Sequence, residues 1–161
     1  MAELLKATGI YYRNELRSIH KNGVKLQPVY EAFTNSWESI LEKYTAEHLN
    51  LGSIVIEFHY NAGMFEEDHE NNLKNLQKII ITDNGIGLNE ESFTRLLNLR
   101  DNSKSTNNKG TGRIQFLHYF DDTIFESVYK VGDNNYRKIC LTLSKKESFL
   151  QANAILRKDF D

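Results

Sequence analysis

The chain has 161 residues, 40% hydrophobic and 26% charged, with a formal net charge of −2 at pH 7. This length suits one domain with a sizeable core, and the composition excludes intrinsic disorder. The small negative charge does not support direct binding to nucleic acid or to an anionic membrane. The single cysteine, Cys140, excludes an intrachain disulfide, and no apolar run approaches the roughly 20 residues of a membrane span. Because a signal-peptide hydrophobic block is also absent, we expect a soluble protein of the cytoplasm.

Apolar periodicity and turn residues predict the elements of the first half of the chain. Pro28 marks a first helical turn, and the predicted helix runs over 28–48. Its apolar stripe recurs at spacings of three and four residues, at Val29, Phe33, Trp37, Ile40 and Tyr44. Residues 53–60 and 76–83 are rich in β-branched and aromatic side chains, which predicts two strands, and the polar stretch 61–72 between them reads as a loop.

The second half predicts two short helices followed by strands. Residues 84–88 are too glycine-rich for regular structure, and a short helix over 89–99 follows with Asn89 as its N-cap. A long polar loop over 100–112 leads into an apolar helix at 113–120. Three strands complete the chain, at 123–132, 136–144 and 151–159. This order predicts an α+β fold in which a mostly antiparallel sheet is covered on one face by helices.

One glycine-rich turn is a candidate ligand site, because the predicted apolar strand before it ends in a carboxylate side chain. In "IITDNGIGL", Asp83 ends the strand, and Gly85 and Gly87 allow positive φ or a close approach of the backbone to a ligand. The carboxylate could accept a hydrogen bond from an amino group in a pocket. The alternative is an ordinary Asn-Gly turn with an Asx-type aspartate.

The loop "NSKSTNNKGTGR" combines positive charge, hydroxyls and glycines before an apolar helix. Gly110 and Gly112 precede that helix, so N–H groups at its end could face an anion such as phosphate. The loop supplies charged and hydroxyl side chains at Ser103, Lys104, Ser105, Thr106, Lys109 and Arg113. It does not match the P-loop pattern, and the alternative is a plain surface loop.

The helix over 28–48 places an acid and an amide on one face. Glu31 and Asn35 are four residues apart and therefore project together. Asn35 could offer an amide oxygen to Mg²⁺, and Glu31 could deprotonate a water that attacks a phosphate. The predicted apolar stripe lies near this face, so both side chains are expected to be partly buried. The alternative is that these are solvated helix residues.

Taken together, the three motifs resemble those of the GHKL ATPases, which include gyrase B, the ninety-kilodalton heat-shock chaperones, MutL and the nucleotide domain of histidine kinases. The family's E-x-x-x-N helix matches "EAFTN", its D-x-G-x-G turn matches "DNGIG", and its lid ending in G-x-G matches "KGTG". Order and spacing agree across residues 28–120. The resemblance implies a single ATP-binding domain over 1–161. Its fold would be the Bergerat-type two-layer α/β sandwich, with a mixed, mostly antiparallel sheet and an ATP lid.

The resemblance also implies a role for each matching residue. Glu31 looks like the general base, and Asn35 looks like the Mg²⁺ ligand. Asp83 looks like the acceptor of a hydrogen bond from the adenine amino group, and Gly85 and Gly87 look like the turn that shapes the base pocket. The remaining candidates for contact with the nucleotide lie in the lid, at Lys104, Ser105, Lys109, Gly110, Thr111 and Gly112.

The implied function is Mg²⁺-dependent binding and slow hydrolysis of ATP, used as a conformational switch by a larger protein, as in the chaperone-like members. It carries the expectations of ATP-dependent homodimerisation, with segment 1–27 as a candidate, and of a further domain C-terminal of residue 161. One alternative is a nucleotide-gated regulatory module with negligible hydrolysis, and another is an interaction domain without nucleotide. A histidine-kinase-type nucleotide domain is less favoured, because those proteins do not use the glutamate at the position of Glu31 as a base. One departure is that "SFLQANAILRKDFD" lacks the Gly-Thr that several members place before a late strand.

Overall fold

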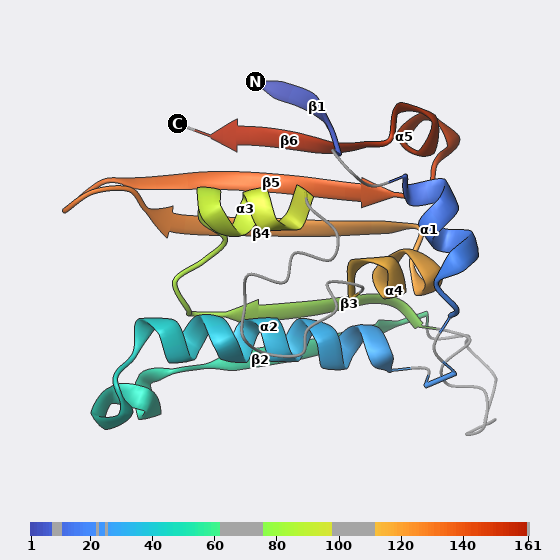
Figure 1. The fold of residues 1–161 in the computed structure, drawn as a ribbon. Coiled ribbons are helices and arrows are strands. Elements are labelled where there is room, and N and C mark those ends of the chain that lie inside the picture. Colours follow the sequence, from blue (N-terminus) through green and yellow to red (C-terminus); the bar gives the residue numbers. More distant parts are fainter. Residues whose placement is uncertain (8–10, 22, 25, 62–75, 98–111, 161) are drawn as a thin grey trace. The chain divides into compact units, whose positions relative to one another are not determined.

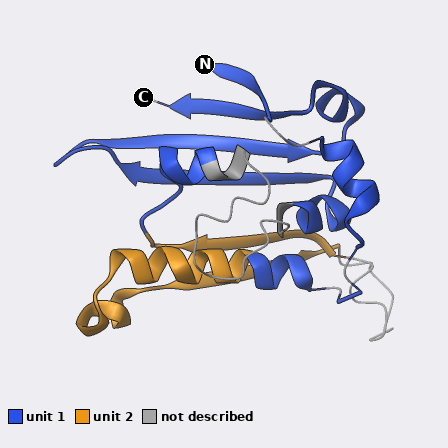
Figure 2. Ribbon diagram, viewed as in Figure 1, with its two compact units in different colours: residues 1–31, 86–161 blue, residues 32–85 orange. Residues whose placement is uncertain are grey.

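The computed structural model describes residues 1–161 except 8–10, 22, 25, 62–75, 98–111 and 161 (Figure 1). The described residues form helices and antiparallel sheets, which confirms the α+β class. They divide into two compact units, residues 1–31 with 86–161 and residues 32–85 (Figure 2). Within the described ranges, no helix has the length and apolar character needed to cross a membrane.

The first unit contains a four-stranded antiparallel sheet in the order β1-β6-β5-β4. Its strands are β1 (Ala2–Lys6), β4 (Asp122–Lys130), β5 (Tyr136–Ser144) and β6 (Ala154–Phe160). The register pairs Glu126 with Cys140 and Cys140 with Lys158. Because side chains alternate along a strand, the even-numbered residues of all four strands share one face of the sheet and the odd-numbered residues share the other.

The odd-numbered face of this sheet carries the hydrophobic core. Ile139, Leu141 and Ile155 are fully buried on it. Three helices contribute apolar side chains to the same cluster: α1 (Tyr12–Ser18), α3 (Glu90–Leu97) and α4 (Gly112–Tyr119). Strands 123–132 and 136–144 and the helix 113–120 were therefore predicted at close to their observed bounds, and helices cover one face of the sheet as expected.

Two parts of the first unit differ from the sequence-based expectation. Strand β1 pairs with β6, although nothing local in the N-terminal segment predicted a strand. The predicted strand 151–159 begins later, because α5 (Glu147–Ala152) occupies its first residues. Asn153 ends α5 in the left-handed conformation at φ 51°. Its side chain accepts from the Tyr12 amide at 2.9 Å and donates to the Ala7 carbonyl at 3.2 Å, which fixes the break at this residue.

The second unit contains most of α2 (Gln27–Lys43), the 3-10 helix η1 (Ala46–Leu51), and a two-stranded antiparallel sheet of β2 (Ile54–Tyr60) and β3 (Leu76–Asp83). The predicted strand 76–83 has the observed bounds, and the predicted helix ends at Lys43 instead of His48. The described strands thus form two sheets, where the sequence suggested one. Gly52 is the C-cap of η1, and a Cβ at this position would lie 2.5 Å from the Ile40 side chain.

The buried face of α2 matches the predicted apolar stripe only in part. Phe33 and Trp37 are each 42% exposed, whereas Ser36 is 7% and Ile40 1% exposed. The prediction that the stripe anchors the helix was therefore wrong for Phe33 and Trp37, and it is confirmed for Val29 and Ile40, which are 9% and 1% exposed. The physical reason is the closeness of α2 to the glycine turn after β3, where only small side chains fit.

Candidate functional site

The carboxylate of Asp83 is held on two sides at the end of β3. Its Oδ2 accepts a hydrogen bond from the Ser36 hydroxyl of α2 at 2.8 Å, and its Oδ1 accepts one from the Gly85 amide at 2.9 Å. Ser36 is buried while Asp83 is exposed. The carboxylate is therefore oriented by the protein and remains accessible to a ligand.

Asn84 fastens the turn that follows Asp83. Its side chain accepts from the Ser53 amide and donates to the Leu51 carbonyl, both at 2.8 Å. The Asn84 carbonyl in turn accepts from Lys43 Nζ at 2.6 Å. The turn is thus tied to α2 and to the junction of η1 with β2, so its backbone is fixed before any ligand arrives.

Gly85 is required by the contact between this turn and α2. A Cβ at this position would lie 2.1 Å from Ser39 Oγ and 2.7 Å from the Ser39 backbone carbon. A backbone atom cannot rotate away as a side chain can, so any larger residue would push the helix from the turn. Sequence reasoning missed Ser36 and Ser39, although their spacing of three residues on one helix is the signal for a shared face.

Gly87 lies in the first unit and is required for two reasons. Its φ is +80°, a region that side-chain-bearing residues rarely adopt, and a Cβ there would lie 2.5 Å from the Val128 carbonyl of β4. The next amide, that of Leu88, donates to Ser127 Oγ at 2.6 Å. The second glycine therefore lets the chain run close against β4.

Helix α2 carries Glu31 and Asn35 one turn apart, as predicted. At about 100° of rotation per residue, Asn35 lies to one side of Ser36 and Trp37 to the other. Glu31 is half-buried and accepts from Gln27 Nε2 at 3.0 Å, whereas Asn35 is exposed. The expected burial thus holds for Glu31 and not for Asn35. The acid and the amide share a flank of the helix opposite the exposed aromatic residues.

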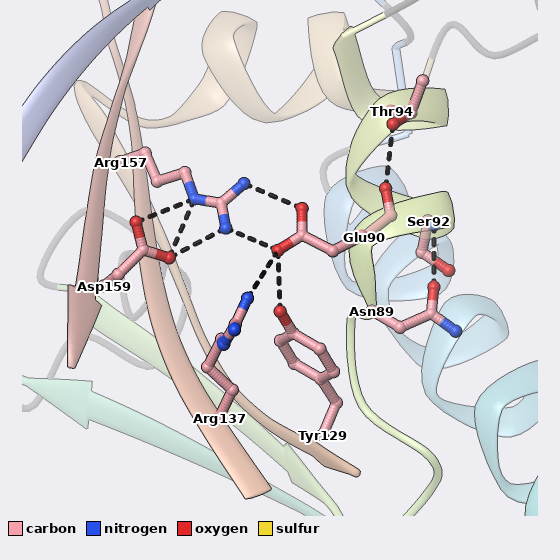
Figure 3. A network of polar contacts seen from close by, with 8 residues as sticks. All are labelled: Asn89, Glu90, Ser92, Thr94, Tyr129, Arg137, Arg157 and Asp159. Carbon is pink, nitrogen blue, oxygen red and sulfur yellow. Dashed lines mark hydrogen bonds and ion pairs between the residues drawn. The ribbon is translucent and has the colours of Figure 1, made fainter. Parts of the chain in front are cut away.

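A second polar cluster surrounds Glu90, the first residue of α3 (Figure 3). The Arg157 guanidinium of β6 donates to both carboxylate oxygens of Glu90, at 2.6 and 3.0 Å, and also binds Asp159. Tyr129 Oη donates to the same carboxylate at 2.8 Å, and Arg137 lies 3.8 Å from it. The hydrogen bonds from Arg157 lower the pKa of Glu90 to about 2, and burial raises the pKa of Tyr129.

This cluster fastens the start of α3 to three strands of the first unit. The Arg157 side chain is 13% exposed and lies over the Phe93 ring at 4.6 Å. Asn89 accepts from the Ser92 amide at 2.9 Å, which confirms the predicted N-cap. The segment from Gly87 to Glu90 is therefore rigidly placed. Nothing in the sequence indicated the Glu90–Arg157 pair, because its members are 67 residues apart.

Most of the predicted lid segment lies outside the described residues. Gly112 is the exception and is the first residue of α4, one residue before the predicted start of that helix at 113. The other lid candidates fall in the range 98–111, so the structure does not bear on them: Lys104, Ser105, Lys109, Gly110 and Thr111.

Within the second unit the structure brings Asp83 and Gly85 together against the α2 residues Ser36 and Ser39. Among the described residues there is no group of three or more His, Cys, Asp or Glu side chains suited to a metal ion. A Mg²⁺ ion bound by an amide oxygen and by phosphate oxygens needs no such group. Comparisons of the chain with protein-family models, curated proteins and solved structures found no match.

Proposed function

We propose that this chain is a GHKL-type domain that binds ATP with Mg²⁺ and hydrolyses it slowly, as a conformational switch for a larger protein. The observation that carries the proposal is the fixed, accessible carboxylate of Asp83 beside Gly85. The order of the three sequence motifs adds support, and we propose the family's two-layer sandwich with an ATP lid as the complete fold.

Asp83 has the hydrogen-bonding capacity that recognition of adenine needs. An ionised carboxylate offers about four acceptor positions, and Ser36 and Gly85 use two of them. The exposed remainder can accept from the exocyclic amino group of adenine. Guanine carries a carbonyl oxygen at that ring position, which would face the carboxylate as a second acceptor. Selectivity for adenine follows from this mismatch.

The contact of Gly85 with Ser39 supports a base pocket at this turn. Without a side chain, the Gly85 backbone lies against α2, and the Asn84 hydrogen bonds hold it there. Ser39 fills the space beside Gly85 where a Cβ would lie, so this contact holds the turn, and with it the Asp83 carboxylate, in place for a ligand. Such pre-ordering lowers the entropic cost of binding.

Glu31 and Asn35 are assigned to the phosphate end by their resemblance to the family motif. The exposed amide of Asn35 would hold Mg²⁺, which when bound neutralises charge on the phosphate oxygens. Glu31 would accept the proton of the attacking water while the water oxygen bonds to the γ-phosphorus. The bond from that phosphorus to the β–γ bridging oxygen breaks, and ADP leaves. The lid residues Lys104, Ser105 and Lys109 are proposed phosphate contacts.

Replacing one carboxylate tests the proposal. Asp83→Asn keeps the shape of the side chain but puts a donor in place of one acceptor, so we expect ATP binding to weaken by about tenfold or more. Asp133→Asn makes the same change in an exposed turn and serves as the matched control. Calorimetric titration with ATP measures both. Equal affinities of wild type and Asp83→Asn would remove Asp83 from adenine recognition. Binding without phosphate release would leave the regulatory-module alternative.

A further inference from the structure

The even-numbered face of the four-stranded sheet is open and rich in lysine. It lies opposite the face that carries the core cluster. Large apolar side chains are exposed on it, among them Ile124 at 60%, Val128 at 57% and Leu4 at 53%. Each strand adds a lysine to this face, at Lys6, Lys130, Lys138 and Lys158. The acids among its described strand residues are Glu126 and, at the opposite end of β4 from Lys130, Asp122, which is paired with Lys146 at 3.2 Å.

Lysines and aromatic rings gather at one end of this face, where the β4–β5 hairpin meets the end of β6. We define the lysine–aromatic patch as Lys130, Tyr136, Lys138, Lys158 and Phe160. The register places Lys130 opposite Tyr136 and Lys138 opposite Phe160, on neighbouring strands about 4.8 Å apart. Tyr136 is 67% and Phe160 44% exposed.

The charge of the patch favours an anionic partner. Three of its five residues are lysines. The carboxylate of the neighbouring Glu126 lies 3.4 Å from Lys138 Nζ and offsets the charge of that lysine. Lys138 Nζ also lies 5.4 Å from the centroid of the Phe160 ring. The chain as a whole has a net charge of −2, so this excess of positive charge is local to the face.

The exposed rings narrow the class of anion. Aromatic side chains on an open sheet can stack on bases, provided that the bases are unpaired. A duplex keeps its bases stacked on one another, and an acidic peptide would satisfy the lysines without offering flat rings to Tyr136 and Phe160. A single strand offers phosphates and base faces together, at spacings that side chains on adjacent strands can follow.

We propose that the lysine–aromatic patch binds single-stranded nucleic acid, with bases stacked on Tyr136 and Phe160 and phosphates bound by the three lysines. The inference is independent of the nucleotide proposal, because no patch residue belongs to the candidate ATP site. Both can be tested on the same chain, and either can fail alone.

Fluorescence anisotropy with a labelled oligothymidine of about 20 nucleotides tests the patch on the full chain, and this probe contains no adenine. With three lysines, the logarithm of the binding constant should fall with the logarithm of salt concentration at a slope of about −2. Tyr136→Ala should weaken binding about tenfold, and Tyr136→Phe should retain it. The double variant Lys130→Ala/Lys158→Ala should reduce the slope to about −0.7.

Lys146→Ala is the control for loss of a surface lysine, because it removes one positive charge from an exposed residue just beyond the far end of β5. Unchanged binding by this variant supports the patch, with thermal unfolding confirming that all variants are folded. Absence of oligothymidine binding by the wild type would overturn the proposal. A loss of affinity in Lys146→Ala as large as that in Lys130→Ala/Lys158→Ala would also overturn it. Binding of duplex DNA that is insensitive to Tyr136→Ala would also overturn it. Binding of labelled polyglutamate at the patch in place of oligothymidine would assign an acidic protein partner instead.

Discussion

Replacing Glu90 by glutamine should destabilise the protein in a way that depends on pH. The pKa of Glu90 is lowered from 4.5 to about 2, first of all by its hydrogen bonds with Arg157. At about 1.4 kcal/mol per pKa unit, this difference corresponds to an upper limit of about 3.5 kcal/mol of folding free energy. The Glu90 side chain is 49% exposed, and solvent screening reduces the value. We therefore expect Glu90→Gln to lower the free energy of unfolding by about 1 to 2 kcal/mol at pH 7.

The sign of the pH dependence follows from the direction of the pKa change. Since the pKa is lower in the folded state, the ionised carboxylate stabilises the fold above about pH 4.5, and this contribution is lost as pH falls toward about 2. Urea unfolding of wild type and Glu90→Gln at pH 7 and at about pH 3 should show a difference that narrows in acid. Glu126→Gln breaks an exposed ion pair with Lys138 and should change the free energy of unfolding by less than about 1 kcal/mol. A Glu90→Gln difference that is absent at pH 7, or equal at both pH values, would refute the reasoning.

Three further predictions concern the turn, the helix cap and the base. Gly85→Ala should lower the free energy of unfolding, measured by thermal unfolding, by about 1 to 3 kcal/mol. Gly23→Ala, which has nothing within 4 Å of the added Cβ, should change it by no more than about 0.5 kcal/mol. Equal changes in the two variants would contradict the contact of Gly85 with α2. Asn89→Ala should cost about 1 kcal/mol through the lost cap of α3, and a neutral result in denaturant unfolding would argue against that cap. Glu31→Ala should abolish phosphate release while calorimetry shows retained ATP binding, and unchanged turnover would remove Glu31 from the role of base.

Features set by neighbouring residues were predictable from the sequence. The strand over 76–83 has its predicted bounds because an apolar run meets a glycine turn directly after Asp83. Asn89 caps α3 because its side chain reaches an amide three residues along, which is a local interaction. Gly85 and Gly87 stood out by type alone, and each proves to have no room for a Cβ.

Features set by distant residues were not predictable. Strand β1 depends on pairing with β6 at the opposite end of the chain. The buried face of α2 was predicted only in part, because apolar residues usually mark the buried stripe, whereas beside the glycine turn the buried positions belong to the small residues Ser36 and Ser39. The hydrogen bonds from Arg157 to Glu90 join residues that are 67 positions apart and meet only in the tertiary structure. The lysine–aromatic patch depends on strand register, because register decides which side chains share a face of the sheet. The net charge of the whole chain carries no information about this.

The most direct test of the central claim is calorimetric titration of the wild-type chain with ATP and with GTP, each with and without Mg²⁺. A carboxylate fixed by Ser36 and Gly85 should bind ATP and discriminate against GTP by about tenfold or more, since guanine places an acceptor against Asp83. Mg²⁺ should strengthen the binding of ATP more than that of ADP, because the ion bridges the terminal phosphates. Equal affinity for ATP and GTP, or no binding of either, would contradict the account.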